Sequence, residues 1–379
     1  MRSSSREAIH LVLFMTRNVS LQTWEQIGSF EREVAIYQAF QSMGHQVSIV
    51  SYGTKKDLKY QSCLGGINIL CNRWNLPLKV YEKLLPWLHG KILRTCDVIK
   101  TNQMNGAETA LRAAQVWRKP FIARCGFLFS LNTAREQGEE SPLTHKAVEV
   151  ERNVFSLADL IFVTTSEMQK FICEKYSLEP MKIKVVPNYV DTQRFRPINI
   201  EKKGTRKIVF VGRLSFEKNL ENLLYAIEGL DIQLQIVGSG GLSSRLNQIA
   251  QERRLPVSFL GNIPNRELPT LLNEADIFIL PSLYEGHPKA LLEAMSCGLP
   301  VIGTNSPGIR EILVHQYNGY LCGLSSEEIR DAITNVMSNE PLRLQMGINA
   351  RQYILENCSL DKISNIEIGL IKQLIGLPE

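Results

Sequence analysis

The chain has 379 residues, of which 44% are hydrophobic and 21% charged, and its formal net charge at neutral pH is +5. This length predicts two domains, because it exceeds what one hydrophobic core usually supports. The composition is that of a soluble globular protein, and no apolar run is long enough to span a bilayer, which excludes membrane-spanning helices from the expected architecture.

The small excess of positive charge is compatible with an anionic membrane surface or a phosphorylated substrate, and we expect no nucleic acid partner. Residues 1–8 lack the apolar core of a signal peptide, so we expect a cytoplasmic protein, with peripheral binding to the inner face of the membrane as an alternative. Eight cysteines without C-x-x-C spacing favour reduced, mostly buried thiols over disulfides or zinc.

The chain opens with the pattern of a strand, a helix and a second strand. Residues 10–16 predict a strand, 17–30 a loop, 31–43 a helix and 47–50 the next strand. The loop carries Gly28 and Ser29 just before the helix, and a glycine there favours a tight turn.

Residues 76–95 form a basic amphipathic segment interrupted by Pro86. Its apolar members alternate with positive charges contributed by Lys79, Lys83, Lys91 and Arg94. Two interpretations stay open: a segment that rests on a membrane carrying a lipid-linked acceptor, or a helix packed on the core with solvated lysines.

Two further strands are predicted at 97–100 and 121–123, each followed by polar residues. In parallel sheets, ligands bind at the carboxyl ends of the strands, so Asn102 and Arg124 are expected at a binding cleft. Arg124 could contact an acceptor or a phosphate, or it could be a structural ion-pair partner. Another strand, 160–165, precedes a helix over 166–176 capped by Ser166.

The first domain is expected to span residues 1–190, and a charged, turn-rich linker covers 191–207. A second domain follows over 208–359, and an apolar-basic segment, 360–379, ends the chain.

The second domain opens with a strand at 208–211, a loop containing Gly212, Arg213 and Lys218, and a helix at 220–227. An arginine and a lysine beside a helix N-terminus can neutralise a departing pyrophosphate without a metal ion. A strand at 234–237 then leads to Gly238 in a glycine loop, where backbone could approach a nucleotide closely, and a turn over residues 259–263 follows.

Residues 276–311 hold the densest concentration of polar chemistry. A strand at 277–280 precedes a loop and a helix that starts near Pro288, and two carboxylates, Glu285 and Glu293, flank the first helical amides. Free amides attract phosphate, and a nearby carboxylate can accept two sugar hydroxyls, so this stretch predicts a nucleotide-sugar site.

Three motifs give this hypothesis a family. They are E-G-x-P-x-x-L-L-E-A-M-x-x-G-x-P-V-I from Glu285, G-R-L-x-x-x-K-N from Gly212 and P-N-x-V-D-x-x-x-F from Pro187. Together they resemble the retaining glycosyltransferases of family 4. The resemblance implies the GT-B fold, an α/β architecture of two doubly wound, Rossmann-like domains that face a central cleft, with the last helix packing back on the first domain.

The resemblance also implies an activity: transfer of a sugar from a nucleotide-diphosphate donor to a hydroxyl acceptor with retention at the anomeric carbon. The acceptor could be a glycan, a lipid-linked molecule or a small molecule. The chain has no D-x-D sequence, so we expect the leaving diphosphate to be stabilised without a metal ion, and we expect no cofactor. As the donor, a UDP- or GDP-sugar is preferred over an ADP-sugar.

Site residues carry over position by position. Those expected to act in catalysis are Arg213, Lys218 and Glu285. Those expected to bind the donor are Gly28, Gly212, Gly238, Ile263, Gly286, His287, Lys289, Ala290, Leu291 and Glu293. Those on the acceptor side are Asn102 and Arg124, since no histidine stands where many relatives have one.

Some alternatives stay open at this point. His287, where many relatives have phenylalanine, could bond the transferred sugar or pack as a neutral imidazole. A nucleotide-sugar epimerase of the same fold, or a non-catalytic partner subunit, would share much of the pattern. With no obvious nucleophilic carboxylate on the first domain, the leaving phosphate is the expected base.

Overall fold

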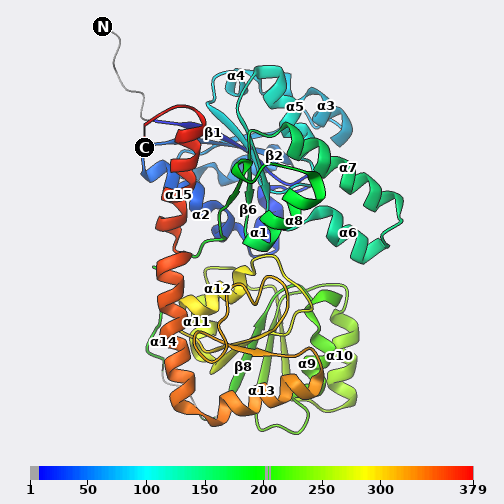
Figure 1. Cartoon of the computed structure of the whole chain (residues 1–379), viewed down its shortest axis with the longest axis vertical. Helices are drawn as coiled ribbons and strands as arrows, with labels where there is room; N and C mark the ends of the chain where they lie inside the picture. The colour runs from blue at the N-terminus through cyan, green and yellow to red at the C-terminus, as the bar shows by residue number, and fades with distance from the viewer. Residues whose placement is uncertain (1–7, 201–203, 205, 379) are drawn as a thin grey trace. The chain divides into compact units, whose positions relative to one another are not determined.

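A computed structural model describes residues 8–200, 204 and 206–378, in which two compact units are distinguished (Figure 1). Unit 1 comprises the chain up to Glu25, Glu33–Pro187 and the segment from Ile363 onward. Unit 2 comprises Gln26–Arg32 and Asn188–Lys362. Part of the expected linker, residues 201–203 and 205, lies outside the described residues, as do 1–7 and 379.

Unit 1 is built on a seven-stranded, wholly parallel sheet in the order β3-β2-β1-β4-β5-β6-β7. Parallel strands buried on both faces need continuous apolar sequence, and all five residues of β1 are buried. The strands are β1 (His10–Phe14), β2 (Gln46–Thr54), β3 (Asn68–Asn72), β4 (Val98–Thr101), β5 (Phe121–Cys125), β6 (Leu160–Val163) and β7 (Ile183–Val185).

The connections of unit 1 are helical. They are α1 (Leu21–Gln26), α2 (Phe30–Ser42), the 3₁₀ helix η1 (Lys55–Ser62), α3 (Leu78–Leu88), α4 (Gly90–Leu93), α5 (Ala107–Trp117), α6 (Phe129–Gln137), α7 (Pro142–Leu157), α8 (Ser166–Tyr176), η2 (Pro180–Lys182) and the final helix α15 (Leu360–Leu374).

Unit 2 has a six-stranded parallel sheet in the order β10-β9-β8-β11-β12-β13. Its strands are β8 (Lys207–Val211), β9 (Gln233–Val237), β10 (Val257–Gly261), β11 (Ile277–Leu280), β12 (Val301–Thr304) and β13 (Tyr320–Cys322). Its helices are η3 (Phe216–Lys218), α9 (Leu220–Ala226), α10 (Ser243–Glu252), α11 (Leu268–Glu274), α12 (Lys289–Ser296), α13 (Ser326–Ser338) and α14 (Glu340–Asn357).

Each sheet reverses its strand order once, between β1 and β4 in unit 1 and between β8 and β11 in unit 2. At such a reversal the connections on either side leave in opposite directions, which opens a crevice at the carboxyl ends of the two central strands. These two places are therefore where ligand-binding loops are expected.

Several local expectations were wrong. Residues 17–30 are not all loop, because α1 forms within them, and Pro86 does not break the segment, since it lies inside α3. Thr165, not Ser166, caps α8, its hydroxyl accepting from the Met168 amide.

Of the eight cysteines, six are buried and all are free thiols. Among the described helices, none is long and apolar enough to cross a membrane.

The final helix is held to the unit 1 sheet by a buried ion pair. Lys100 at 1% side-chain exposure, from β4, donates to the Glu367 carboxylate of α15, which is fully buried. The aromatic rings of Tyr37 and Phe162 lie 5.5 and 5.9 Å from the same ammonium. A charge removed from water in this way depends on its partner.

Replacing Glu367 with Gln will lower the free energy of unfolding by about 3 kcal/mol, because the buried Lys100 ammonium loses its ion pair with the Glu367 carboxylate. Urea denaturation followed by circular dichroism measures the loss. The matched control is Glu228→Gln, which breaks the exposed pair with Arg253 and should cost less than about 1 kcal/mol. Equally small losses of unfolding free energy in both variants would contradict a stabilising role for the buried Lys100–Glu367 pair.

Candidate functional site

The loops that follow β8 and β11 meet at the point where the unit 2 sheet reverses. The amide of Leu283 donates to the carbonyl of Glu217 at 2.8 Å. The Lys218 ammonium lies 2.5 Å from Oε1 of Glu285, and the two side chains are mostly buried, with 15% and 11% of their surface exposed. Two residues 67 positions apart, both expected in catalysis, are thus brought into direct contact.

The loop after β8 is shaped by a short 3₁₀ helix, η3, which ends at Lys218. Asn219 follows in the left-handed conformation, with φ of 54°, and its side-chain amide donates to the Leu324 carbonyl. This turn aims the lysine towards the neighbouring loop. Arg213, on the same loop, is exposed.

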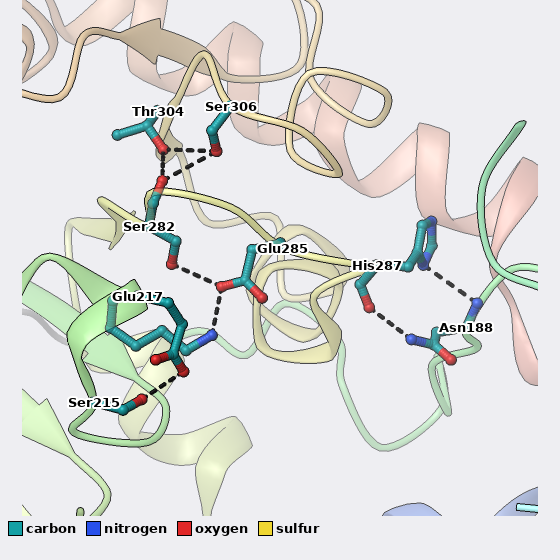
Figure 2. A network of polar contacts seen from close by, with 9 residues as sticks. Asn188, Ser215, Glu217, Ser282, Glu285, His287, Thr304 and Ser306 are labelled. Carbon is teal, nitrogen blue, oxygen red and sulfur yellow. Dashed lines mark hydrogen bonds and ion pairs between the residues drawn. The ribbon is translucent and has the colours of Figure 1, made fainter. Parts of the chain in front are cut away.

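The loop after β11 is braced by hydroxyl groups (Figure 2). The Ser282 hydroxyl donates to Glu285 Oε1 at 2.7 Å, while the hydroxyls of Thr304 and Ser306 both donate to the Ser282 carbonyl. Gly308 closes the contact, since a Cβ there would lie 2.3 Å from the carbonyl oxygen of Gly286. The Glu285 carboxylate is therefore held in place before any ligand arrives.

Helix α12 begins directly after this loop, with Pro288 as its N-cap. Lys289, Ala290 and Leu291 form its first turn, where amides have no acceptor within the helix and the helix dipole favours an anion. The three expected backbone donors therefore stand at the N-terminus that follows the Glu285 loop.

Glu293 lies in the second turn of α12 and is 2% exposed. Its Oε1 accepts from the Asn265 side-chain amide at 2.8 Å, and Nη1 of Arg32 lies 3.7 Å from its Oε2. Asn265 also donates its backbone amide to the Gly28 carbonyl, 2.9 Å away. Gly28 has φ of 72°, and a Cβ on it would lie 2.5 Å from the Ile263 carbonyl oxygen.

Gly28, Ile263 and Glu293, three residues expected to bind the donor, are thus joined in unit 2 through Asn265. Sequence reasoning missed Asn265 and Arg32. Asn265 stands two positions after Ile263, which was expected to bind the donor, and this closeness in sequence was the one available signal.

The His287 side chain is fixed by Asn188, the asparagine of the P-N-x-V-D motif. The Asn188 amide donates to His287 Nδ1 at 3.2 Å, and its side chain donates to the His287 carbonyl at 2.6 Å (Figure 2). With Nδ1 acting as an acceptor, the imidazole is neutral and carries its proton on Nε2. This arrangement fits the interpretation of a packed imidazole, and a contact between His287 and the transferred sugar stays a prediction.

The glycines after β8 and β9 are required by packing between backbones. Gly238 has φ of 127°, and a Cβ there would stand 1.9 Å from the Gly212 carbonyl oxygen. The Gly212 amide in turn donates to the Val237 carbonyl at 3.0 Å. Their expected closeness to a nucleotide is therefore not the only reason for glycine at these positions.

In unit 1, the two acceptor-side candidates lie at the carboxyl edge of the sheet. Asn102 directly follows β4 and is partly exposed. Arg124 was expected in a loop but belongs to β5, where it is 9% exposed and its amide donates to the Thr101 hydroxyl. The correction arises because β5 continues two residues beyond its apolar run.

Sequence reasoning also missed an ion pair in unit 1, whose arginine donates its amide to the Asn105 carbonyl in the loop after β4. The Arg17 guanidinium makes two contacts with the Glu82 carboxylate, at 2.7 and 2.8 Å. Burial, together with the Glu82 charge, raises the pKa of the neighbouring Tyr52, which therefore stays a neutral phenol.

Among the described residues there is no group of three His, Cys, Asp or Glu side chains that could hold a metal ion.

Two family models match the chain and together span most of it. The model described as glycosyl transferases group 1 matches residues 191–353, and the one described as glycosyltransferase family 4 matches residues 34–194. The boundary between them falls next to the boundary between the two units at Pro187 and Asn188.

Curated relatives include an uncharacterised glycosyltransferase from Methanocaldococcus jannaschii, 24% identical over 93% of this chain and 97% of its own length. A second, from Escherichia coli, is named UDP-Gal:alpha-D-GlcNAc-diphosphoundecaprenol alpha-1,3-galactosyltransferase. It is 32% identical over 56% of this chain and 60% of its own length.

Solved structures with the same fold include a sucrose-phosphate synthase from Thermosynechococcus elongatus, with a TM-score of 0.80 at 18% identity, covering 98% of this chain and 100% of that one. An Anabaena protein in complex with UDP and glucose has a TM-score of 0.77 at 18% identity, covering 96% and 99%. The expected fold class, α/β with two Rossmann-like units of the GT-B type, is thereby confirmed.

The imidazole of His287 will carry a single proton on Nε2 at neutral pH, because Nδ1 accepts from the Asn188 amide. A long-range ¹⁵N–¹H correlation spectrum distinguishes the two tautomers, and the spectrum of His287→Gln assigns the signal. His145, with a side chain 65% exposed, serves as the control and should show averaged tautomers. A proton on Nδ1 of His287 would contradict the hydrogen bond.

Proposed function

Because the chain belongs to the group 1, family 4 glycosyltransferases, we propose that it transfers a sugar from a nucleoside diphosphate sugar to a hydroxyl acceptor with retention of the anomeric configuration. The observation that carries the proposal is the contact between Lys218 and Glu285 at the reversal of the unit 2 sheet. It places a cation and a carboxylate beside the N-terminus of α12, where a diphosphate and its sugar would meet.

The bond to be broken joins the anomeric carbon to the diphosphate oxygen, and negative charge grows on that oxygen as it leaves. Lys218, Arg213 and the amides of α12 would stabilise this charge, with no metal ion required. The acceptor hydroxyl forms the new bond on the same face of the sugar, and its proton passes to the departing diphosphate.

The ion pair gives Lys218 and Glu285 linked roles. Without donor, Lys218 neutralises Glu285. A bound diphosphate would share the lysine, and Glu285, still held by the Ser282 hydroxyl, would then be available to the hydroxyls of the transferred sugar. Glu285 is therefore proposed to act on the sugar and not on the nucleotide.

Glu293 is proposed to bind the ribose. A carboxylate accepts hydrogen bonds from two adjacent hydroxyls, and Asn265 already fixes Oε1 of Glu293. Nη1 of Arg32, 3.7 Å from Oε2, lies at the long end of ion-pair distances, so ribose hydroxyls would replace it at that oxygen. Asn265 thus acts as a positioning residue for Glu293.

We propose a UDP-sugar as the first donor to test, ahead of GDP-sugars, and no cofactor. The Escherichia coli relative is named for a UDP-Gal donor and a diphosphoundecaprenol acceptor, and the Anabaena structure holds UDP. Both names support a uridine nucleotide donor, and the first also supports a hydroxyl acceptor carried on a lipid diphosphate.

Replacing Lys218 with Ala will lower the turnover number by about 10²- to 10³-fold, because the lysine acts on charge that grows in the transition state. Steady-state kinetics with the best donor measures the loss. Lys207→Ala is the matched control: it removes another ion-paired lysine, from the start of the strand β8 that precedes the Lys218 loop, and turnover should not change. Equal effects of the two substitutions would show that the site lies elsewhere.

Substitutions of the two carboxylates, Glu293 and Glu285, should affect different steps. Glu293→Gln should weaken binding of the free nucleoside diphosphate, while Glu285→Gln should lower turnover and leave that binding intact, since Lys218 is released from its partner. Calorimetry with the nucleoside diphosphate distinguishes them. The reverse result would mean that the two roles have been exchanged.

Transfer will continue in the presence of EDTA, because fixed cations take the place of a metal ion in this mechanism. The test compares initial rates with and without the chelator after dialysis. Activity that disappears with EDTA and returns with Mn²⁺ would refute the metal-free proposal.

A further inference from the structure

Helix α3 of unit 1 has two separate apolar faces. One is buried against the core and includes Tyr81 and Leu85, both 0% exposed. The other is open to solvent and consists of Val80 at 42%, Leu84 at 40% and Trp87 at 57% exposure. A helix that only covered a core would place polar residues there.

The exposed residues form a continuous stripe. At about 3.6 residues per turn, positions 80, 84 and 87 recur on one side of a helix, and positions 79 and 83 lie along its border. The stripe is therefore bordered by Lys79 and Lys83, both of which are exposed.

Trp74 is a second exposed tryptophan near the end of the helix. It is 47% exposed, and its ring lies 5.7 Å from that of His89, just past the end of α3. Burial lowers the pKa of His89 to about 4, so the imidazole adds no charge at neutral pH. We call Trp74, Val80, Leu84 and Trp87 the α3 face.

The exposed charges of the segment that carries the α3 face all have one sign. Residues 73–94 contain a single acid, Glu82, which is buried and bound to Arg17. The basic residues of the same segment are all exposed, namely Arg73, Lys79, Lys83, Lys91 and Arg94. The segment therefore presents tryptophan and aliphatic side chains within a border of positive charge.

We propose that the α3 face binds the surface of a bilayer rich in anionic lipid. Indole rings favour the region between headgroups and acyl chains, and lysine and arginine favour the headgroup phosphates, so both parts of the face fit one partner. A second copy of the chain fits poorly, because a two-fold interface would set these positive charges against themselves. The inference goes beyond sugar transfer and does not depend on it.

The first experiment measures partition of the protein, without donor or acceptor, onto sedimented vesicles of phosphatidylcholine with and without phosphatidylglycerol. Binding should require the anionic lipid and fall as salt is raised. The variant K79Q/K83Q should partition roughly 30-fold more weakly, since each basic residue contributes about 1 kcal/mol at such a surface. The control K146Q/K170Q removes two exposed lysines from α7 and α8 of the same unit and should bind as the wild type does.

A second pair of variants tests the apolar part. L84S/W87S should lose vesicle binding by at least about tenfold while its thermal unfolding stays that of the wild type. The control L344S/I348S removes two exposed apolar side chains, at 63% and 64% exposure, from α14 of unit 2. Lipids brominated in the acyl chain should quench wild-type tryptophan fluorescence and spare a W74F/W87F variant.

Three results would overturn the proposal. One is failure to bind anionic vesicles at low salt. Another is binding that survives both K79Q/K83Q and L84S/W87S. The third is a change from dimer to monomer in L84S/W87S by sedimentation velocity, which would show that a second copy covers the face. Since no sugar is transferred in these assays, a failed transfer reaction leaves them interpretable.

Discussion

Parallel strand pairing is the constraint on which both units depend. It brings the carboxyl ends of all strands in a sheet to one edge, and a single reversal of strand order opens a crevice between the two central strands. Lys218 and Glu285 follow those two strands in unit 2, and their ion pair spans the reversal. In unit 1, Arg17 and Asn102 follow the corresponding strands. The polar chemistry of the chain is thus placed by topology and not by closeness in sequence.

Much of the fold could be predicted from sequence because buried parallel strands are short apolar runs, and β11 was located to the residue. Elements without such runs were missed. Helix α1 has only six residues, too few for a periodic pattern, and β3 is a five-residue strand with asparagine at both ends. In the site, motifs identified Lys218, Glu285 and Glu293, but their partners come from distant segments. Asn265 and Arg32 beside Glu293 required three-dimensional contacts.

Buried carboxylates in this chain each have a specific donor. Glu82 is bound by Arg17, Glu293 by Asn265 and Glu367 by Lys100. Apolar packing tolerates small shifts, but an ion pair or hydrogen bond in a low-dielectric interior fixes which residues must meet. These contacts therefore fix how neighbouring elements are aligned along one another. The hydrophobic core alone would allow small shifts in that alignment. Gly28 and Gly308 fix register in a different way, since backbones there approach too closely for a side chain.

The assignment of Gln26–Arg32 to unit 2, although both flanking segments belong to unit 1, has a consequence for how the protein is made. During synthesis this short piece leaves the ribosome before most of unit 1 and before the remainder of unit 2, so the two units are not made one after the other. A fragment beginning at Asn188 would lack the carbonyl of Gly28 that receives the Asn265 amide and the guanidinium beside Glu293. Gene truncation or domain exchange at the obvious boundary would therefore yield a unit 2 in which Asn265 and Glu293 have lost these two contacts.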